Sequence, residues 1–151
     1  MKRFSIMLVC LFLVLSMVVT PVSASEVSDS IVLSQTIIQV SDDSYFIETI
    51  SVPTIQLYGN TKKGTKTAAY VTSGTTIFSI SVTGTFNYDG SSSEAISASG
   101  SITAYVDGVT LNSRSAYTSG ASAIATGSVT YNGATLQKTV TLTCDKNGNL
   151  S

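Results

Sequence analysis

The chain has 151 residues, of which 43% are hydrophobic and only 11% charged, with a net charge of −1 and no histidine. This length suits one domain with a substantial core. The absence of histidine excludes Ser-His-Asp and Cys-His catalysis and removes the commonest zinc ligand. Without a positive net charge, binding to nucleic acid is not expected.

The first 24 residues have the pattern of a secretory signal peptide. Lys2 and Arg3 precede an apolar run over 6–19, and Val22-Ser23-Ala24 supplies small residues at the positions that a signal peptidase reads. The run is shorter than the about 20 residues of a spanning helix, so we favour cleavage after Ala24 over a retained anchor. The valine before Cys10 argues against lipidation. We expect a secreted, extracellular protein with no membrane anchor after processing.

Cleavage after Ala24 would leave 127 residues with 6 basic and 9 acidic side chains, and one cysteine, Cys144. A domain held by internal disulfides usually has an even number of cysteines, so packing must stabilise this one. Period-two alternation places Cys144 on one face with Val140 and Leu142, which predicts a buried, inert thiol. An exposed thiol that pairs between chains is the alternative.

Residues 25–66 are expected to form an N-terminal β segment followed by a basic linker. Residues 35–40 and 45–52 alternate like strands around a polar turn, and Pro53 limits further pairing. Asn60 to Lys66 is polar, basic and contains glycine, which favours an exposed linker, with contact to anionic wall polymers as an alternative. The hairpin could either extend the main sheet at its edge or form a semi-independent arm.

Residues 67–151 are expected to form the main domain, an antiparallel, immunoglobulin-like β-sandwich in an all-β chain. Turn dipeptides that tolerate positive φ, such as Asp89-Gly90 and Asn132-Gly133, interrupt an alternation of apolar and hydroxyl residues. They outline strands near 67–72, 75–88, 93–106, 109–118, 121–131 and 134–144. Sequential strands joined by tight turns are antiparallel, and this spacing is typical of sandwiches and barrels.

Two segments, 83–90 and 126–133, repeat one pattern in which a glycine-containing strand ends in tyrosine and a turn. A duplicated binding unit would give such an echo. Because the echo covers only eight residues, we favour two strands that meet the same turn geometry.

Hydroxyl side chains line one side of several predicted strands. Ser79, Ser81, Thr83 and Thr85 do so in one strand, and alternate residues from Thr139 to Thr143 in another. Flat threonine arrays order water in ice-binding proteins. We favour the plainer interpretation, that these are the water-facing sides of a sandwich.

The carboxylates give little sign of a catalytic or metal site. Most lie at predicted turns, where Asp hydrogen-bonds the backbone. Asp42-Asp43 lacks the alternating acidic ligands of a calcium loop. We therefore expect no catalytic residue, cofactor or metal, although a hydrolase that uses two carboxylates alone remains an alternative.

Tyrosines are the strongest candidates for ligand contact, because exposed tyrosines stack on sugars and anchor protein interfaces. Packing within strands is the alternative role for each of them. The candidates are Tyr88, Tyr105, Tyr117 and Tyr131.

Residues 75–97 (TTIFSISVTGTFNYDGSSSEAIS) and 125–151 (ATGSVTYNGATLQKTVTLTCDKNGNLS) resemble a group of small exported β-rich proteins from Gram-positive bacteria. That group has a signal peptide, a Val-Thr-Gly-Thr-Phe strand followed by Tyr-Asn-Gly, and an ending like Thr-Leu-Thr-Cys with an Asn-Gly turn. It commonly has a second cysteine where this chain has Ala95, and often a tryptophan in place of Phe78. The resemblance implies an exported β-sandwich-like domain in which Cys144 is one half of a disulfide that cannot form, and it implies no activity.

Together these observations predict a secreted, non-enzymatic protein, a surface-binding or adhesion-type module for an extracellular protein or glycan. The alternatives are a hydrolase that uses carboxylates alone and a structural or toxin-like exported protein.

Overall fold

The computed structural model describes residues 29–55 and 59–151. Within these ranges the chain forms eight strands and no helix. The predicted signal peptide lies outside the described residues. The strands are β1 (Ser30–Ser41), β2 (Ser44–Pro53), β3 (Thr61–Thr72), β4 (Thr75–Tyr88), β5 (Ser93–Ala104), β6 (Thr110–Ser119), β7 (Ser122–Tyr131) and β8 (Ala134–Thr143).

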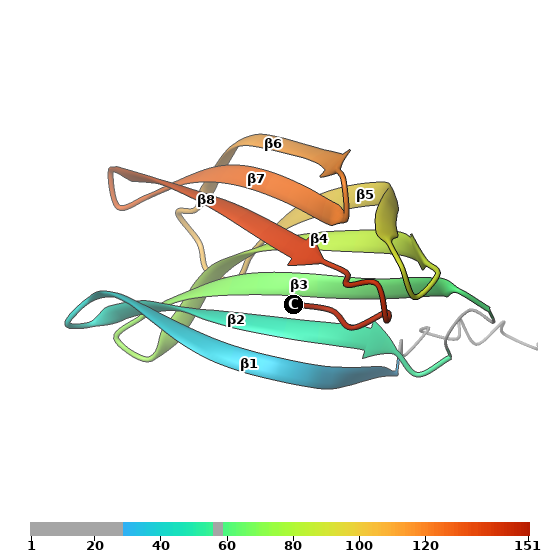
Figure 1. Cartoon of the computed structure of the whole chain (residues 1–151). Coiled ribbons are helices and arrows are strands. Elements are labelled where there is room, and N and C mark those ends of the chain that lie inside the picture. The colour runs from blue at the N-terminus through green and yellow to red at the C-terminus, as the bar shows by residue number, and fades with distance from the viewer. Residues whose placement is uncertain (1–28, 56–58) are drawn as a thin grey trace, which may run out of the picture.

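The strands form two antiparallel sheets that pack face to face (Figure 1). The larger sheet has the order β1-β2-β3-β4-β5 and the smaller has the order β6-β7-β8. This confirms the predicted all-β, antiparallel sandwich. Neighbours within each sheet follow one another in the chain, whereas Greek-key connections interrupt that order in immunoglobulin domains. The likeness to those domains therefore lies in the two layers and not in the strand order.

The strands predicted in the main domain are present, and tight turns join most of them. Strand 75–88 has the predicted bounds. β3 begins at Thr61 and not at the predicted residue 67, and the ends of the other strands differ from the prediction by one or two residues. The predicted turn residues take positive φ, with Gly90 at 85°, Asn132 at 51° and Gly133 at 78°.

The basic segment that we predicted to be an exposed linker is instead part of a central strand. Thr61–Lys66 forms the first half of β3, paired on one side with β4 and, from Thr65, on the other with β2. Lys66 reaches Glu48 at 3.5 Å, and a Cβ atom on Gly64 would collide with the Leu150 side chain. These long-range contacts fix the segment, and the β1–β2 hairpin joins the main sheet at its edge.

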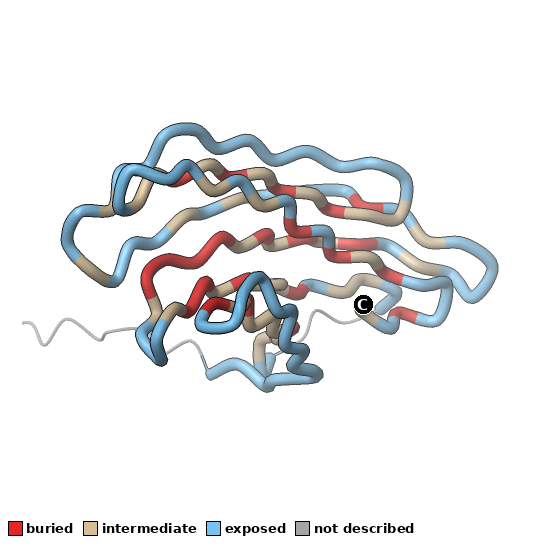
Figure 2. Tube along the Cα trace, turned by 90° about the vertical axis from the view of Figure 1, so that its left-hand side faces the viewer, coloured by how far each residue is buried: buried red, intermediate tan, exposed pale blue. Residues whose placement is uncertain are grey.

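The core lies between the two sheets (Figure 2). An aromatic cluster occupies its β2–β4 side, where the Tyr70 ring centre lies 5.2 Å from that of Phe46 and 5.3 Å from that of Phe78. Aliphatic residues of β4, β7 and β8 complete it, among them Ile80, Val82, Val129, Val140 and Leu142.

Each of the two echoing segments contributes a glycine to the region where β4 and β7 pack against each other. A Cβ atom on Gly84 would lie 2.7 Å from the Ala123 Cβ, and one on Gly127 would lie 2.8 Å from the Ile80 Cδ1. Each glycine thus makes room for the opposite strand, which gives both glycines a packing role.

The smaller sheet covers only part of the larger one. The main contacts between the sheets join β6, β7 and β8 to β3, β4 and β5. β1 lies beyond this overlap, and every residue of β1 is exposed. β6 is likewise exposed along its whole length, at an edge of the smaller sheet.

Candidate functional site

The outer face of the larger sheet carries rows of hydroxyl side chains. Facing residues of antiparallel strands share one side of a sheet, so the pairing register aligns serines and threonines across β2, β3, β4 and β5. We call this surface the hydroxyl face. One row is Thr49, Thr67, Ser81 and Ser101, the next is Ser51, Thr65, Thr83 and Ser99, and the pairs Ser79–Thr103 and Thr85–Ser97 flank them.

Hydrogen bonds between strands hold two pairs of these hydroxyls in place. The Thr65 and Thr83 Oγ1 atoms are 2.8 Å apart, and the Ser81 and Ser101 Oγ atoms are 2.7 Å apart. A hydroxyl offers one donor and two acceptor sites, so each paired hydroxyl keeps hydrogen-bonding capacity toward solvent. The face is therefore an ordered array of neutral donors and acceptors on a rigid sheet.

The sequence produces this face through its period-two alternation. In β4 the even-numbered residues Ile80 and Val82 enter the core, and the odd-numbered Ser81 and Thr83 point outward. Only the rows in β4 and β8 were recognised from the sequence. The Ser97, Ser99 and Ser101 row in β5 shows the same alternation and could have been found by it.

The hydroxyl face has a shallow hollow of about 200 Å³ at one end. Its lining includes the hydroxyl residues Ser51, Thr65 and Thr83, together with Lys63 and Pro53. The Lys63 side chain is exposed and adds a positive charge beside these hydroxyls. The hollow is thus a polar recess able to accept a hydroxyl-rich or weakly acidic group.

Tyr105 lies at the other end of this face. Its backbone N–H donates to the Ile77 carbonyl at 2.9 Å, and its phenol oxygen lies 3.2 Å from the Ser79 Oγ. These two contacts hold the ring against β4 while 57% of the residue stays exposed. Tyr105 therefore presents an aromatic surface beside the hydroxyl rows.

The structure does not bring the four candidate tyrosines together. Tyr117 is 53% exposed and lies on the outer face of the smaller sheet, on the opposite side of the molecule from Tyr105. Tyr88 and Tyr131 are partly buried against the core. Tyr88 ends β4 beside Gly148, whereas Tyr131 ends β7. Each tyrosine must therefore be assessed separately.

The smaller sheet has an outer hydroxyl face of its own. Its cross-strand pairs include Thr126–Thr139 at 2.9 Å and Ser122–Thr143 at 3.0 Å. Tyr117 lies opposite Ile124 on this surface. It resembles the larger face in chemistry but spans only three strands.

Two carboxylates share a small pocket of about 190 Å³ at the β4–β5 turn, where Asp89 and Glu94 lie near Tyr88. The Asp89 carboxylate accepts hydrogen bonds from the backbone and hydroxyl groups of Ser91 and Ser92. The hydrogen bonds of Ser91, followed by that of the Ser92 N–H, lower the pKa of Asp89 to about 2. A carboxylate in this state stabilises a turn and is poorly suited to act as a general acid.

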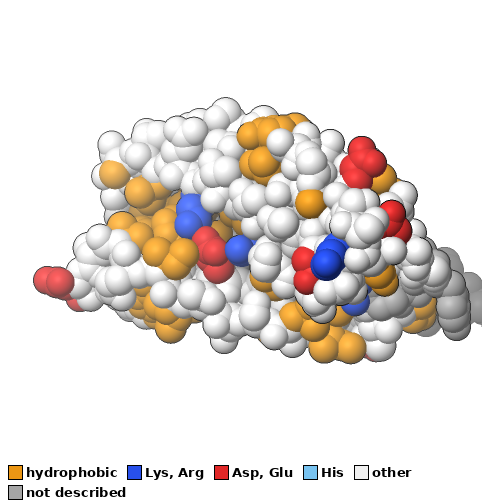
Figure 3. All heavy atoms as spheres, viewed as in Figure 1, with side chains coloured by type: hydrophobic (Ala, Val, Ile, Leu, Met, Phe, Trp, Pro, Cys, Tyr) orange, Lys and Arg blue, Asp and Glu red, His pale blue; other side chains and the backbone are white. Residues whose placement is uncertain are grey.

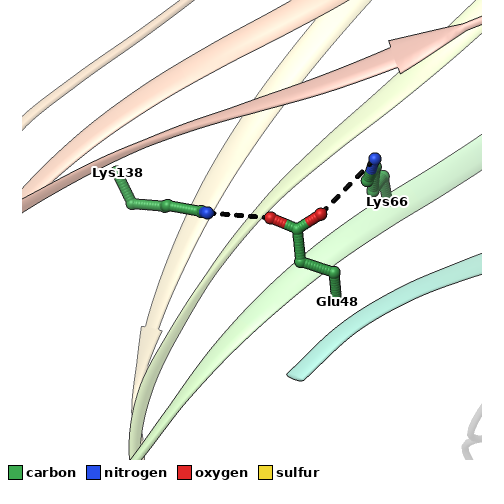
Figure 4. Close-up of polar contacts among 3 residues, drawn as sticks. All are labelled: Glu48, Lys66 and Lys138. Carbon is green, nitrogen blue, oxygen red and sulfur yellow. Dashed lines mark ion pairs between the residues drawn. The ribbon is translucent and has the colours of Figure 1, made fainter. Parts of the chain in front are cut away.

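A charged cluster links β8 of the smaller sheet to β2 and β3 of the larger sheet (Figures 3 and 4). Glu48 of β2 lies 2.8 Å from Lys138 of β8 and 3.5 Å from Lys66 of β3. The Lys138 Nζ also lies 4.9 Å from the centre of the Phe46 ring. Burial raises the pKa of Glu48, but hydrogen bonds and charges from both lysines outweigh it and lower the pKa overall. The cluster attaches β8 to the larger sheet.

Cys144 is a free thiol with 1% exposure, which confirms the predicted burial. Burial raises its pKa, so the thiol form is favoured and reactivity is low. Its N–H donates to the Ala121 carbonyl, and the N–H of Ala95 donates to the neighbouring Gly120 carbonyl. The β6–β7 turn thus places Cys144 and Ala95 in one corner of the core.

No protein-family model, curated protein or solved structure matches the chain. Within residues 29–55 and 59–151, no cluster of three or more acidic or cysteine side chains could share a metal ion. In the same ranges, no helix has the length and apolar character needed to cross a membrane.

Proposed function

We propose that this protein is a secreted, non-enzymatic, adhesion-type binding module, and that the hydroxyl face binds a neutral glycan. The observation that supports this proposal is the combination of ordered hydroxyl rows with an exposed tyrosine ring at their end. The hydroxyl pairs Thr65–Thr83 and Ser81–Ser101 supply hydrogen-bonding groups in fixed positions. The Tyr105 ring supplies an apolar surface on which a sugar ring stacks.

The geometry of the face predicts the character of this binding. A paired sheet loses little conformational entropy when it binds, because its backbone and its hydrogen-bonded hydroxyls are already ordered. An open sheet face also buries less of its ligand than a closed pocket does. We therefore expect weak binding to single sugars and stronger binding to polymers that contact several rows at once.

Tyr105 and Tyr117 form a matched pair for testing this assignment, because they have similar exposure and lie on opposite faces. The processed protein is first screened against a glycan array and against insoluble cell-wall and host polysaccharides. Tyr105→Ala should lower retention on the bound glycan about two- to twelvefold, in line with the about 0.5–1.5 kcal/mol of an aromatic contact. Tyr117→Ala should bind like the unaltered protein.

The outcomes are distinct. If no glycan retains the folded protein, or if Tyr105→Ala binds as well as the unaltered chain, the hydroxyl face is not a glycan site. If only Tyr117→Ala loses binding, the ligand is held by the smaller sheet. Secretion is tested separately by N-terminal sequencing of protein from the culture medium, which should begin at Ser25.

A further inference from the structure

β1 forms one edge of the larger sheet, and none of its aliphatic side chains belongs to the core cluster. It pairs with β2 on one side only. Figure 3 shows hydrophobic side chains along the border of the molecule where Figure 1 places β1. The exposed aliphatic residues of this strand are Ile31, Val32, Leu33, Ile37, Ile38 and Val40.

A comparison with β6 shows that exposure alone does not explain this composition. β6 is also exposed throughout, but it consists mainly of Ser, Thr and Asn and carries the charged residue Arg114. β1 has neither a charged residue nor a proline, the features by which natural edge strands resist pairing with another chain. Beyond cross-strand neighbours in β2 such as Ile47 and Phe46, the folded monomer covers the aliphatic side chains of β1 only in part.

The central part of β1 is regular and suits pairing with a copy of itself. Irregularities in the β1–β2 pairing occur between Val32 and Ser34 and between Gln39 and Ser41, which leaves Ser34–Gln39 uninterrupted. In an antiparallel pair centred on Ile37, each Ile37 faces the Ile37 of the second copy. Each Gln35 then faces a Gln39, so that uncharged residues meet on the same side of the sheet, although the Gln39 amide already donates to the Ser41 carbonyl of its own chain.

We propose that two copies of this protein associate edge to edge through an antiparallel β1–β1 contact centred on Ile37. Uncharged strands pair without like-charge repulsion, and the unpaired backbone groups of both edges form hydrogen bonds. A two-fold contact of this kind uses the β1 edge of each copy, so it closes as a dimer and does not propagate as a fibre.

The size of the contact predicts its strength. In the register centred on Ile37, the nine residues 33–41 of β1 face their counterparts over about 30 Å. One strand width, about 5 Å, over both faces of that length amounts to about 300 Å² per copy, less than half of a standard interface. We therefore expect a reversible dimer whose dissociation constant is about 1–100 µM.

Sedimentation equilibrium of the processed chain tests the dimer directly. The average mass should rise from monomer toward dimer between about 1 and 200 µM. Ile37→Lys should raise the dissociation constant at least tenfold, because two charges would face each other at the centre of the contact. The matched control is Ile96→Lys in β5, since Ile96 is 52% exposed and Ile37 is 64% exposed.

A charge-swap mixture tests the register. Ile37→Lys and Ile37→Glu should each be monomeric alone and should dimerise when mixed, because the opposite charges would then face each other. A processed chain that stays monomeric at about 200 µM overturns the proposal without any variant. Equal effects of Ile37→Lys and Ile96→Lys, or a mixture that stays monomeric, also overturn it. Tyr105→Ala should dimerise normally, which separates this test from that of glycan binding.

Discussion

Ala95→Cys is expected to form a disulfide with Cys144. Both positions are in the core, with 5% and 1% exposure, and their N–H groups bond the adjacent carbonyls of Gly120 and Ala121. The single substitution would therefore supply the partner that Cys144 lacks.

The expected gain in the free energy of unfolding follows from the length of the loop that the disulfide closes. A link between positions 95 and 144 encloses about 50 residues, for which loop-closure entropy gives about 4 kcal/mol. Adding a sulfur atom to a packed corner costs about 1–3 kcal/mol. The net stabilisation should be about 2 kcal/mol, which corresponds to a rise in Tm of about 8 °C for a domain of this size.

Thiol counting and thermal melting measure the outcome. After oxidation of the processed variant, which lacks Cys10, at mildly alkaline pH to offset the raised pKa of Cys144, the unfolded protein should show no free thiol. Its Tm should fall to near that of the unaltered chain on reduction. Ala95→Ser is the control, because it adds a similar side chain that cannot form the link. If the variant is oxidised while folded and two free thiols are then counted after unfolding, the placement of Ala95 beside Cys144 is refuted.

Two further predictions concern the packing and charge of the sandwich. Gly84→Ala should destabilise the fold by about 2–3 kcal/mol in urea unfolding, because the new Cβ meets the buried Phe86 ring and the fixed Cβ of Ala123. Gly127→Ala should cost less, since its new Cβ meets the flexible side-chain ends of Ile80 and Ile102, and equal losses would contradict this reasoning. Glu48 has a lowered native pKa, so its ion pairs add stability above its unfolded pKa, and this contribution is lost as pH falls through the native pKa. Glu48→Gln should therefore flatten the stability profile between about pH 5 and 3, and an unchanged profile would contradict this.

Sequence reasoning succeeded where the information is local. Alternation and turn dipeptides depend on neighbouring residues, so β4 was predicted with its observed bounds. The linker prediction was wrong because the determinants of β3 are distant. Lysines and glycine disfavour strands locally, but Lys66 meets Glu48, and Gly64 makes room for Leu150. Neither contact is visible in the sequence of that segment.

The same limit applies to the candidate site. Alternation predicts which residues share one side of a strand, but not which strands become neighbours. The row from Thr49 to Ser101 exists only because β2, β3, β4 and β5 pair in that order. Tyr105 and Tyr117 have similar exposure, yet they lie on opposite sides of the molecule. The sequence could therefore identify candidate residues but not the surface they form.

The two proposals are linked by the direction of the two-fold axis. In an edge-to-edge pair this axis runs perpendicular to the joined sheet, so the outer faces of both copies lie on the same side. Two hydroxyl faces would then lie side by side on one surface, and the two Ile37 residues would lie between them at the dimer contact. A polymer long enough to reach both faces would bind through both copies and gain avidity, whereas a short oligosaccharide would contact only one. A weak dimer could in this way turn weak contacts with single sugars into selective retention on polymeric surfaces.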